Sequence, residues 1–212
     1  MPVTTENVLQ WLKQYAHVLH ENRDYLTQLD SAIGDADHGI NMDRGFQAVN
    51  EKLAGMQQMD IGSILKTVGT TLVSTVGGAS GPLYGTAFLR AGIATTGKHE
   101  LYEADMVNLL TVFIEGIKVR GKAQAGEKTM LDALIPALEA ARKAEEKKPG
   151  LGQLIHQSSA AAEVGAKETT SMIATKGRAS YLGERSRGHQ DPGATSSWLL
   201  LKTLSTTLTE QQ

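Results

Sequence analysis

The segment Val8-Leu-Gln-Trp11-Leu12-Lys-Gln-Tyr15-Ala-His-Val-Leu19 decides the fold class of this chain. Its large apolar residues recur at steps of three and four, which places them on one face of an α-helix. The same spacing recurs at Phe46, Val49 and Leu53, at Ile61, Ile64, Leu65, Val68 and Leu72, at Met106, Leu109, Leu110, Phe113 and Ile117, and at Trp198, Leu201, Leu204 and Leu208. Strand-like alternation is hard to find, so the sequence predicts an all-α fold of about eight helices.

The composition is that of one globular domain. Of the 212 residues, 41% are hydrophobic and 21% are charged, which is typical of a folded protein rather than a disordered one. A net charge of −2 without a basic run argues against nucleic acid or a membrane as the partner. The chain has no cysteine, no secretory signal and no apolar run of about 20 residues. We therefore expect a single domain over residues 1–212 and a cytoplasmic location.

Three carboxylates gather in the segment Asp30-Ser-Ala-Ile-Gly34-Asp35-Ala-Asp37-His38-Gly39-Ile40-Asn41. Crowded carboxylates repel one another, and a divalent cation such as Mg²⁺ removes that conflict. The alternative is that each aspartate caps a helix or closes a turn. The residues alone leave both interpretations open.

Two further loops combine glycine with residues that suit phosphate. Gly77-Gly-Ala79-Ser80-Gly81-Pro82 leads into a predicted helix, whose first N–H groups attract phosphate; the alternative is a tight helix crossing. Between residues 176 and 194, Arg178 can neutralise phosphate charge, and Asp191-Pro192-Gly193 predicts a turn before the last helix. The alternative for this segment is an ion-paired surface loop.

Residues 121–129, Gly-Lys-Ala-Gln-Ala-Gly-Glu127-Lys128-Thr129, resemble a P-loop only in part. Glu127 separates the second glycine from the lysine, and the preceding segment is predicted to be helical rather than a strand, so we exclude a P-loop. Thr129 and Asp132 instead predict the start of the next helix. Since a histidine in a polar loop more often forms hydrogen bonds than acts as a nucleophile, we assign no phosphohistidine to His38 or His189.

Six motifs follow one another along the chain. They are Gly34-Asp-Ala-Asp-His-Gly39, Gly77-Gly-Ala-Ser-Gly-Pro82, Arg120-Gly-Lys-Ala123, Gly126-Glu-Lys-Thr-Met130, Gly177-Arg-Ala-Ser-Tyr-Leu-Gly-Glu-Arg185 and Gly188-His-Gln-Asp-Pro-Gly-Ala-Thr195. In this order they resemble the nucleotide-binding L subunit of bacterial dihydroxyacetone kinases, over essentially the whole chain. The resemblance implies a barrel of eight antiparallel helices that binds nucleotide with the loops at one end.

The same resemblance implies the functional residues. Asp30, Asp35 and Asp37 would hold two Mg²⁺ ions against the phosphates of ADP or ATP, and Arg178 would have a catalytic role. The implied nucleotide contacts are His38, Gly39, Ile40, Asn41, Ala79, Ser80, Gly121, Met130, Arg178, Asp191, Pro192 and Gly193.

The resemblance also implies a division of labour. ATP-dependent relatives join this domain to a larger substrate domain, for which 212 residues leave no room. In the phosphotransferase-dependent kind, ADP stays bound, is rephosphorylated by a phosphohistidine protein fed from phosphoenolpyruvate, and donates to dihydroxyacetone held on a separate K subunit. Other readings are free exchange of ATP, another ketose or sugar acid as substrate, a nucleotide sensor that docks on a transcription regulator, and an inactive helical scaffold. The sequence leaves a homodimer open.

Overall fold

A computed structural model describes residues 1–209 of the chain. The α-helices in this range are α1 (Thr5–Glu21), α2 (Arg23–Ile33), α3 (His38–Leu53), α4 (Ile61–Thr75), α5 (Ser80–Ala94), α6 (Glu103–Gly121), α7 (Leu131–Lys147), α8 (Leu151–Glu168) and α9 (Pro192–Thr209). Two 3₁₀ helices, η1 (Thr169–Ser171) and η2 (Arg178–Ser186), lie between α8 and α9. The predicted all-α class is confirmed.

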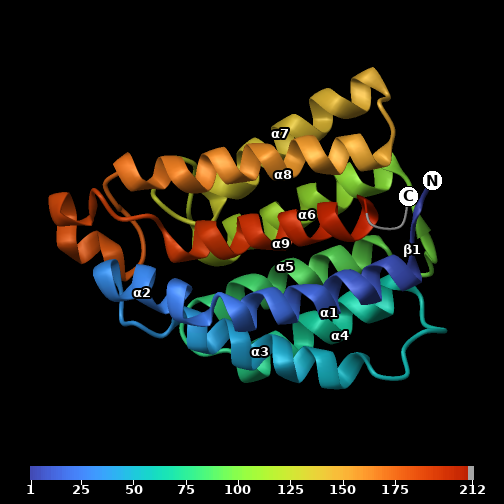
Figure 1. Ribbon diagram of the computed structural model, residues 1–212, viewed down its shortest axis with the longest axis horizontal. Coiled ribbons are helices and arrows are strands. Elements are labelled where there is room, and N and C mark those ends of the chain that lie inside the picture. The colour runs from blue at the N-terminus through green and yellow to red at the C-terminus, as the bar shows by residue number, and fades with distance from the viewer. Residues whose placement is uncertain (210–212) are drawn as a thin grey trace.

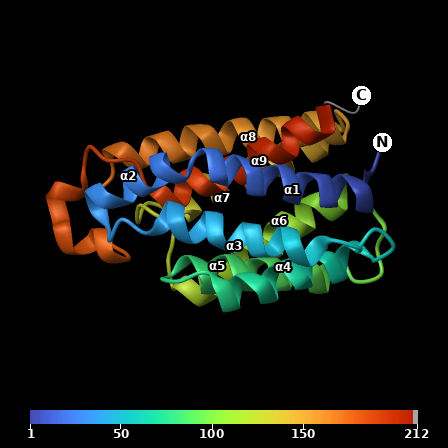
Figure 2. The ribbon, with the colours of Figure 1, turned by 60° about the horizontal axis from the view of Figure 1, so that its bottom comes forward.

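Eight of these helices form a closed barrel. In chain order, α1, α3, α4, α5, α6, α7, α8 and α9 each pack on the next, and α9 returns to α1. The helix α2 lies outside this ring of neighbours, beyond the end of α1 (Figures 1 and 2). The strands β1 (Val3–Thr4) and β2 (Glu100–Leu101), which the periodicity did not predict, pair in antiparallel fashion. They tie the start of α1 to the loop before α6.

The predicted apolar stripes form the core inside the barrel. On α1, Trp11, Leu12, Tyr15 and Leu19 are all buried, and each large apolar side chain removed from water stabilises the fold by about 1.5–3 kcal/mol. The ring of Tyr15 meets the edge of Phe46 at a centroid distance of 4.7 Å. Because aromatics are scarce, aliphatic side chains and alanine fill most of the remaining space.

Local capping fixes where the helices begin. Thr4 precedes α1 and exchanges hydrogen bonds with Asn7, which forms a capping box. Asp60 precedes α4 and accepts a hydrogen bond from the Ser63 amide at 3.1 Å. Such caps satisfy amides that have no partner within the helix.

The up-and-down order of the helices sorts the loops between two ends. Residues 34–37, 76–79, 122–130 and 169–191 lie at one end, on the left in Figure 1. Residues 54–60, 95–102 and 148–150 lie at the other end, together with the N-terminus. Every second connection therefore contributes to one surface. Within residues 1–209, no helix combines the length and the apolar character needed to cross a bilayer.

Candidate functional site

The four loops at one end of the barrel surround a cavity of about 490 Å³. Of the predicted site residues, the cavity is lined by Asp30, Asp35, Asp37, His38, Ala79, Ser80, Gly121, Met130, Arg178, Asp191, Pro192 and Gly193. These residues come from segments up to 163 positions apart, because Asp30 and Gly193 both line the cavity. The fold thus gathers the predicted residues in one place.

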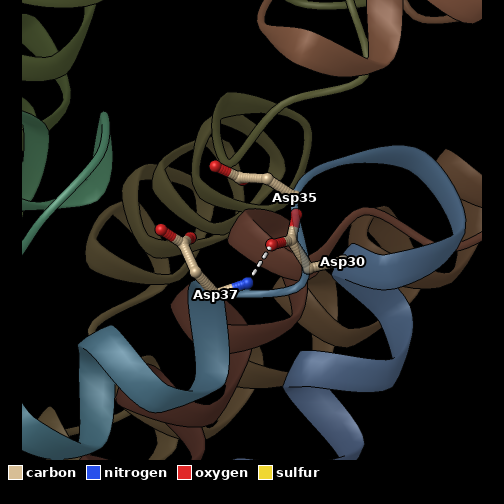
Figure 3. A group of neighbouring side chains, drawn as sticks. All are labelled: Asp30, Asp35 and Asp37. Carbon is tan, nitrogen blue, oxygen red and sulfur yellow. Dashed lines mark hydrogen bonds between the residues drawn. The ribbon is translucent and has the colours of Figure 1, made fainter.

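The acid turn, residues 30–37, supplies three carboxylates. Asp30 is buried in the last turn of α2, and its Oδ2 accepts hydrogen bonds from the amides of Asp37 (2.9 Å) and His38 (3.1 Å). Asp35 and Asp37 follow in the turn, and one oxygen from each of the three carboxylates lies within 4.8 Å of the others (Figure 3). Ala36, between them, has a left-handed φ of 60°. That backbone conformation is unfavourable for alanine and sets the directions of its two acidic neighbours.

The carboxylates of the acid turn repel one another. Burial, followed by the neighbouring Asp35 carboxylate, raises the pKa of Asp37 above its usual range. The guanidinium of Arg178 relieves part of this repulsion, because its Nη2 lies 3.0 Å from Asp35 Oδ2. Oxygen ligands from several carboxylates at this spacing fit a hard divalent cation such as Mg²⁺.

A glycine-rich loop faces the acid turn. Gly78 has a φ of 64°, and a Cβ added there would lie 3.9 Å from Asp37 Oδ2. Ser80 begins α5 immediately afterwards. The free amides at the start of this helix therefore lie next to the carboxylates, in a position suited to phosphate.

His38 belongs to a polar network made of His38, Tyr84 and Ser196, which are buried, and Ser80, which is half-buried. Its Nε2 lies 2.9 Å from Ser196 Oγ and its Nδ1 lies 3.0 Å from Ser80 Oγ, while Tyr84 Oη lies 2.8 Å from Ser196 Oγ. Burial lowers the pKa of His38 to about 4, so the ring is neutral at pH 7. Both nitrogens of His38 are engaged in hydrogen bonds within the protein. Its predicted contact with nucleotide stays a prediction.

The segment from Asp191 to Gly193 closes the cavity at the start of α9. Asp191 Oδ2 accepts a hydrogen bond from the Ala194 amide at 2.7 Å, and the Asp191 amide donates to Thr169 Oγ1 at 2.9 Å. Burial raises the pKa of the Asp191 carboxyl to about 7. Burial therefore favours the protonated form of this aspartate.

The cap, residues 172–189, carries Arg178 to the cavity. The cap contains η2 and projects beyond the barrel at the left of Figure 1. Ser186 is fully buried in it and accepts a hydrogen bond from the Ala174 amide at 2.9 Å. By contrast, the side chain of Arg178 is 68% exposed and has little packing of its own. The backbone of the cap therefore determines which groups this side chain can reach.

Three predicted nucleotide contacts do not line the cavity. Gly39 lies where α3 crosses α2, and a Cβ there would meet the Arg23 carbonyl oxygen at 2.0 Å. Ile40 is 50% exposed, and Asn41 is buried with its Oδ1 accepting a hydrogen bond from Arg44 at 2.7 Å. Their contact with nucleotide stays a prediction.

Sequence reasoning missed the apolar wall and two of the buried polar partners. Ile33, Leu83, Ile117 and Ala123 also line the cavity, which gives a flat ring an apolar surface to pack on. The apolar stripe that includes Ile117 was visible, but its exposure to a cavity was not. Tyr84 and Ser196 gave no signal, because the Ser196 hydroxyl joins Tyr84 across 112 residues and His38 across 158 residues.

Known proteins are similar to this chain in both sequence and fold. The family model for the DAK2 domain matches residues 32–206. The chain is 45% identical to the ADP-binding subunit DhaL of the PEP-dependent dihydroxyacetone kinase of Escherichia coli (strain K12), covering 97% of this chain and 98% of that protein. It is 41% identical to the ADP-binding subunit DhaL of the PTS-dependent dihydroxyacetone kinase of Lactococcus lactis subsp. lactis (strain IL1403), covering 95% and 97%.

Solved structures of a longer kinase give the same fold. The crystal structure of the dihydroxyacetone kinase of C. freundii in its native form superposes with a TM-score of 0.69 at 25% identity, covering 94% of this chain. A second structure of that kinase, in complex with AMP-PNP and Mg²⁺, superposes with a TM-score of 0.70 at 24% identity. The chain spans about a third of the length of that kinase, 34% in both structures. From the match over most of its length, the chain is a member of the DAK2 domain family.

Proposed function

We propose that this chain is the ADP-binding subunit of a multi-subunit dihydroxyacetone kinase. The observation that carries the proposal is the meeting of three carboxylates with the start of α5 at one cavity. Carboxylates and free helix amides together suit a diphosphate held through divalent cations. The similarity to ADP-binding subunits over nearly the whole chain supports the same function.

The cavity suggests how ADP would lie. Asp30, Asp35 and Asp37 would hold two Mg²⁺ ions against the phosphates, and the loop of Ala79 and Ser80 would receive phosphate oxygens. The purine would then pack on the apolar wall near Gly121 and Met130, with residues 191–193 closing the other side. Asp30 is bound to two amides, so one of its oxygens is already fixed before any cation binds.

The chemistry required on this subunit is alignment and charge neutralisation. Phosphoryl transfer needs few covalent contributions from the protein, and Mg²⁺ supplies positive charge at the phosphates when it is bound. Arg178 would add a guanidinium where charge develops. We assign no general base to this chain, since the pKa of His38 is lowered to about 4, which makes it a weak base, and both of its nitrogens are engaged in hydrogen bonds.

Partner proteins would provide the rest of the reaction. A phosphohistidine protein of the phosphotransferase system would phosphorylate bound ADP, and a separate K subunit would present dihydroxyacetone, which leaves as dihydroxyacetone phosphate. The complex would then work in the cytoplasm. A second role, reporting nucleotide state to a transcription regulator, is favoured by one observation. Asp35 pairs with Arg178 of the cap, so cation binding at Asp35 would change the position of the Arg178 side chain on the surface of the cap.

The metal site is tested with Asp35→Ala and the control Asp24→Ala. Asp24 lies on α2 with 87% of its side chain exposed, so its loss alters surface charge without touching the cavity. We expect Asp35→Ala to abolish Mg²⁺-dependent ADP binding in calorimetry and Asp24→Ala to leave it unchanged. Equal ADP affinity in Asp35→Ala and the unmodified chain would contradict the proposed site.

Retention of ADP and the phosphate donor are tested directly. Protein is gel-filtered and denatured, and the supernatant is assayed for nucleotide; stoichiometric ADP is expected, whereas empty protein would favour free exchange. Reconstitution with a K subunit then compares ATP with a phosphoenolpyruvate-driven phosphohistidine donor. Turnover with ATP alone at the same rate would contradict the phosphotransferase-dependent reading.

A further inference from the structure

Lys128 is a buried lysine in the loop between α6 and α7. It is 1% exposed and has a left-handed φ of 61°. Among residues 1–209, no carboxylate lies within ion-pair distance of its ammonium. A buried charge is costly unless hydrogen-bond partners compensate it. An ammonium without a paired carboxylate therefore needs acceptors from the surrounding protein.

Four backbone carbonyls surround the ammonium. Lys128 Nζ donates to the carbonyl oxygens of Thr169 (2.7 Å), Ser186 (2.8 Å), Met172 (3.2 Å) and His189 (2.5 Å). An ammonium has three protons, so one proton is shared between two of these oxygens. The arrangement is that of a cation in a cage of carbonyl oxygens.

The four carbonyls bracket the cap. Thr169 and Met172 stand at its start, whereas Ser186 and His189 stand at its end. One ammonium therefore closes both ends of the segment that carries Arg178. Without it, the carbonyl oxygens of Met172, Ser186 and His189 would lose the donor that the ammonium supplies, whereas that of Thr169 would keep the Met172 amide at 3.2 Å.

The segment that contains Lys128 resembles a P-loop in part, and the position of the lysine agrees with the exclusion of that motif. In a P-loop, the lysine following the glycines reaches the phosphates. Here Lys128 lines the cavity, but its side-chain ammonium is occupied by the four carbonyls. The lysine thus serves the cap rather than contacting a phosphate.

We propose that Lys128 is a positioning residue that closes the cap and so places Arg178 over the bound nucleotide. This rests on the proposed function of the cavity as an ADP site. The connection is physical: the ammonium fixes both ends of the cap, the cap carries Arg178, and Arg178 reaches Asp35 at 3.0 Å. Loss of the ammonium would leave the barrel folded and release the cap.

The chain allows an atom-level test, because it contains no cysteine. In Lys128→Cys, the single thiol is alkylated in denaturant to an aminoethyl group, which restores an ammonium, or to a propyl group, which has the same shape without charge. After refolding, the dissociation rate of a fluorescent ADP analogue is measured with Mg²⁺. We expect about tenfold or faster dissociation for the propyl protein, given the strength of charge-assisted hydrogen bonds, and near-normal dissociation for the aminoethyl protein. Equal rates for the two adducts would overturn the proposal.

Two further measurements separate positioning from general stabilisation. In a chain that also carries Arg178→Ala, the propyl adduct should raise the dissociation rate of the ADP analogue little further, because both changes remove the same contact. Additive increases in that rate would overturn the route through Arg178. Lys122→Met is the matched control, since Lys122 lies in the same loop with a left-handed φ of 49° but is exposed. We expect Lys122→Met to release the ADP analogue at the rate of the unmodified chain.

Hydrogen exchange by mass spectrometry tests the clamp without nucleotide. Residues 172–189 should lose protection in the propyl adduct, while the barrel helices keep theirs. This result would stand even if the cavity bound no ADP, in which case the proposed function would fail and the clamp would not. Unchanged protection of the cap would overturn the clamp. If the alkylated protein fails to refold, Lys128→Met expressed directly is examined by the same exchange measurement.

Discussion

The acid turn and the cap meet at one cavity but are held in different ways. The hydrogen bonds of Asp30 reach only seven and eight residues along the chain, whereas those of Lys128 reach between 41 and 61. The acid turn is therefore built by its own sequence, and the cap is built by the rest of the fold. The comparison teaches that the carboxylate half of the site can form locally, while the cap half depends on tertiary packing.

Removing the buried carboxylate should give the largest effect. Asp30→Ala leaves the amides of Asp37 and His38 without their acceptor, which should lower the free energy of unfolding by about 2–4 kcal/mol. It should also abolish Mg²⁺-dependent ADP binding. Urea unfolding and calorimetry measure the two effects, with Asp24→Ala as the surface control. Normal stability in Asp30→Ala would mean that the turn does not depend on its local hydrogen bonds.

The free energy of unfolding should depend on pH through Asp191, which follows the cap at the start of α9. The raised pKa of about 7, against 3.8 in the unfolded chain, means that the unfolded chain ionises first as pH rises. The folded state therefore loses stability between about pH 4 and pH 7, with no further change from this group above that range. Asp191→Asn removes this loss. Its stability advantage over the unmodified chain should grow by about 2–3 kcal/mol from pH 5 to pH 8.

Urea midpoints of both proteins at the two pH values measure this difference, and subtraction cancels the other carboxylates. The asparagine oxygen can still accept the hydrogen bond from the Ala194 amide, so the geometry is preserved. An advantage that is the same at pH 5 and pH 8 would show that Asp191 is already ionised in the folded protein.

A backbone change in the cap should be smaller and confined to the cap. Gly183 has a φ of 54° and a ψ of −126°, a region that side-chain-bearing residues avoid, and no atom lies within 4 Å of an added Cβ. Gly183→Ala should therefore cost about 1–3 kcal/mol of cap stability through the backbone alone. Hydrogen exchange should rise in residues 172–189 only. Tyr181→Ala, at an 87% exposed position, is the control. A cost spread over the barrel would mean that the cap is not an independent unit.

The smallest change is expected at Ala36. Glycine adopts the left-handed conformation without the penalty that alanine carries, so Ala36→Gly should raise the free energy of unfolding by about 0.5–1 kcal/mol. Urea unfolding with and without Mg²⁺ gives the measurement. A marked loss of stability would show that the methyl group of Ala36 makes contacts that outweigh its backbone strain.

The same contrast explains how far the sequence could predict the site. Asp30, Asp35 and Asp37 were found because their chemistry repeats within eight positions, and the start of α5 was found because glycine and proline mark it. The helices were found from their apolar stripes. By contrast, the roles of Lys128 and Ser196 depend on partners far along the chain, and a lone lysine or serine looks the same in any loop. The strand pair at Val3 and Leu101 is too short for a periodic signal.

The placement of alternate loops at opposite ends has a practical consequence for engineering. Met1 lies at the end of the barrel away from the cavity (Figure 1), and the connection between α7 and α8 lies there too. Affinity tags, fluorescent fusions or a circular permutation opened at residues 148–150 can be introduced at that end without steric obstruction of the cavity. Surface immobilisation through the N-terminus would likewise leave the cap exposed to solution.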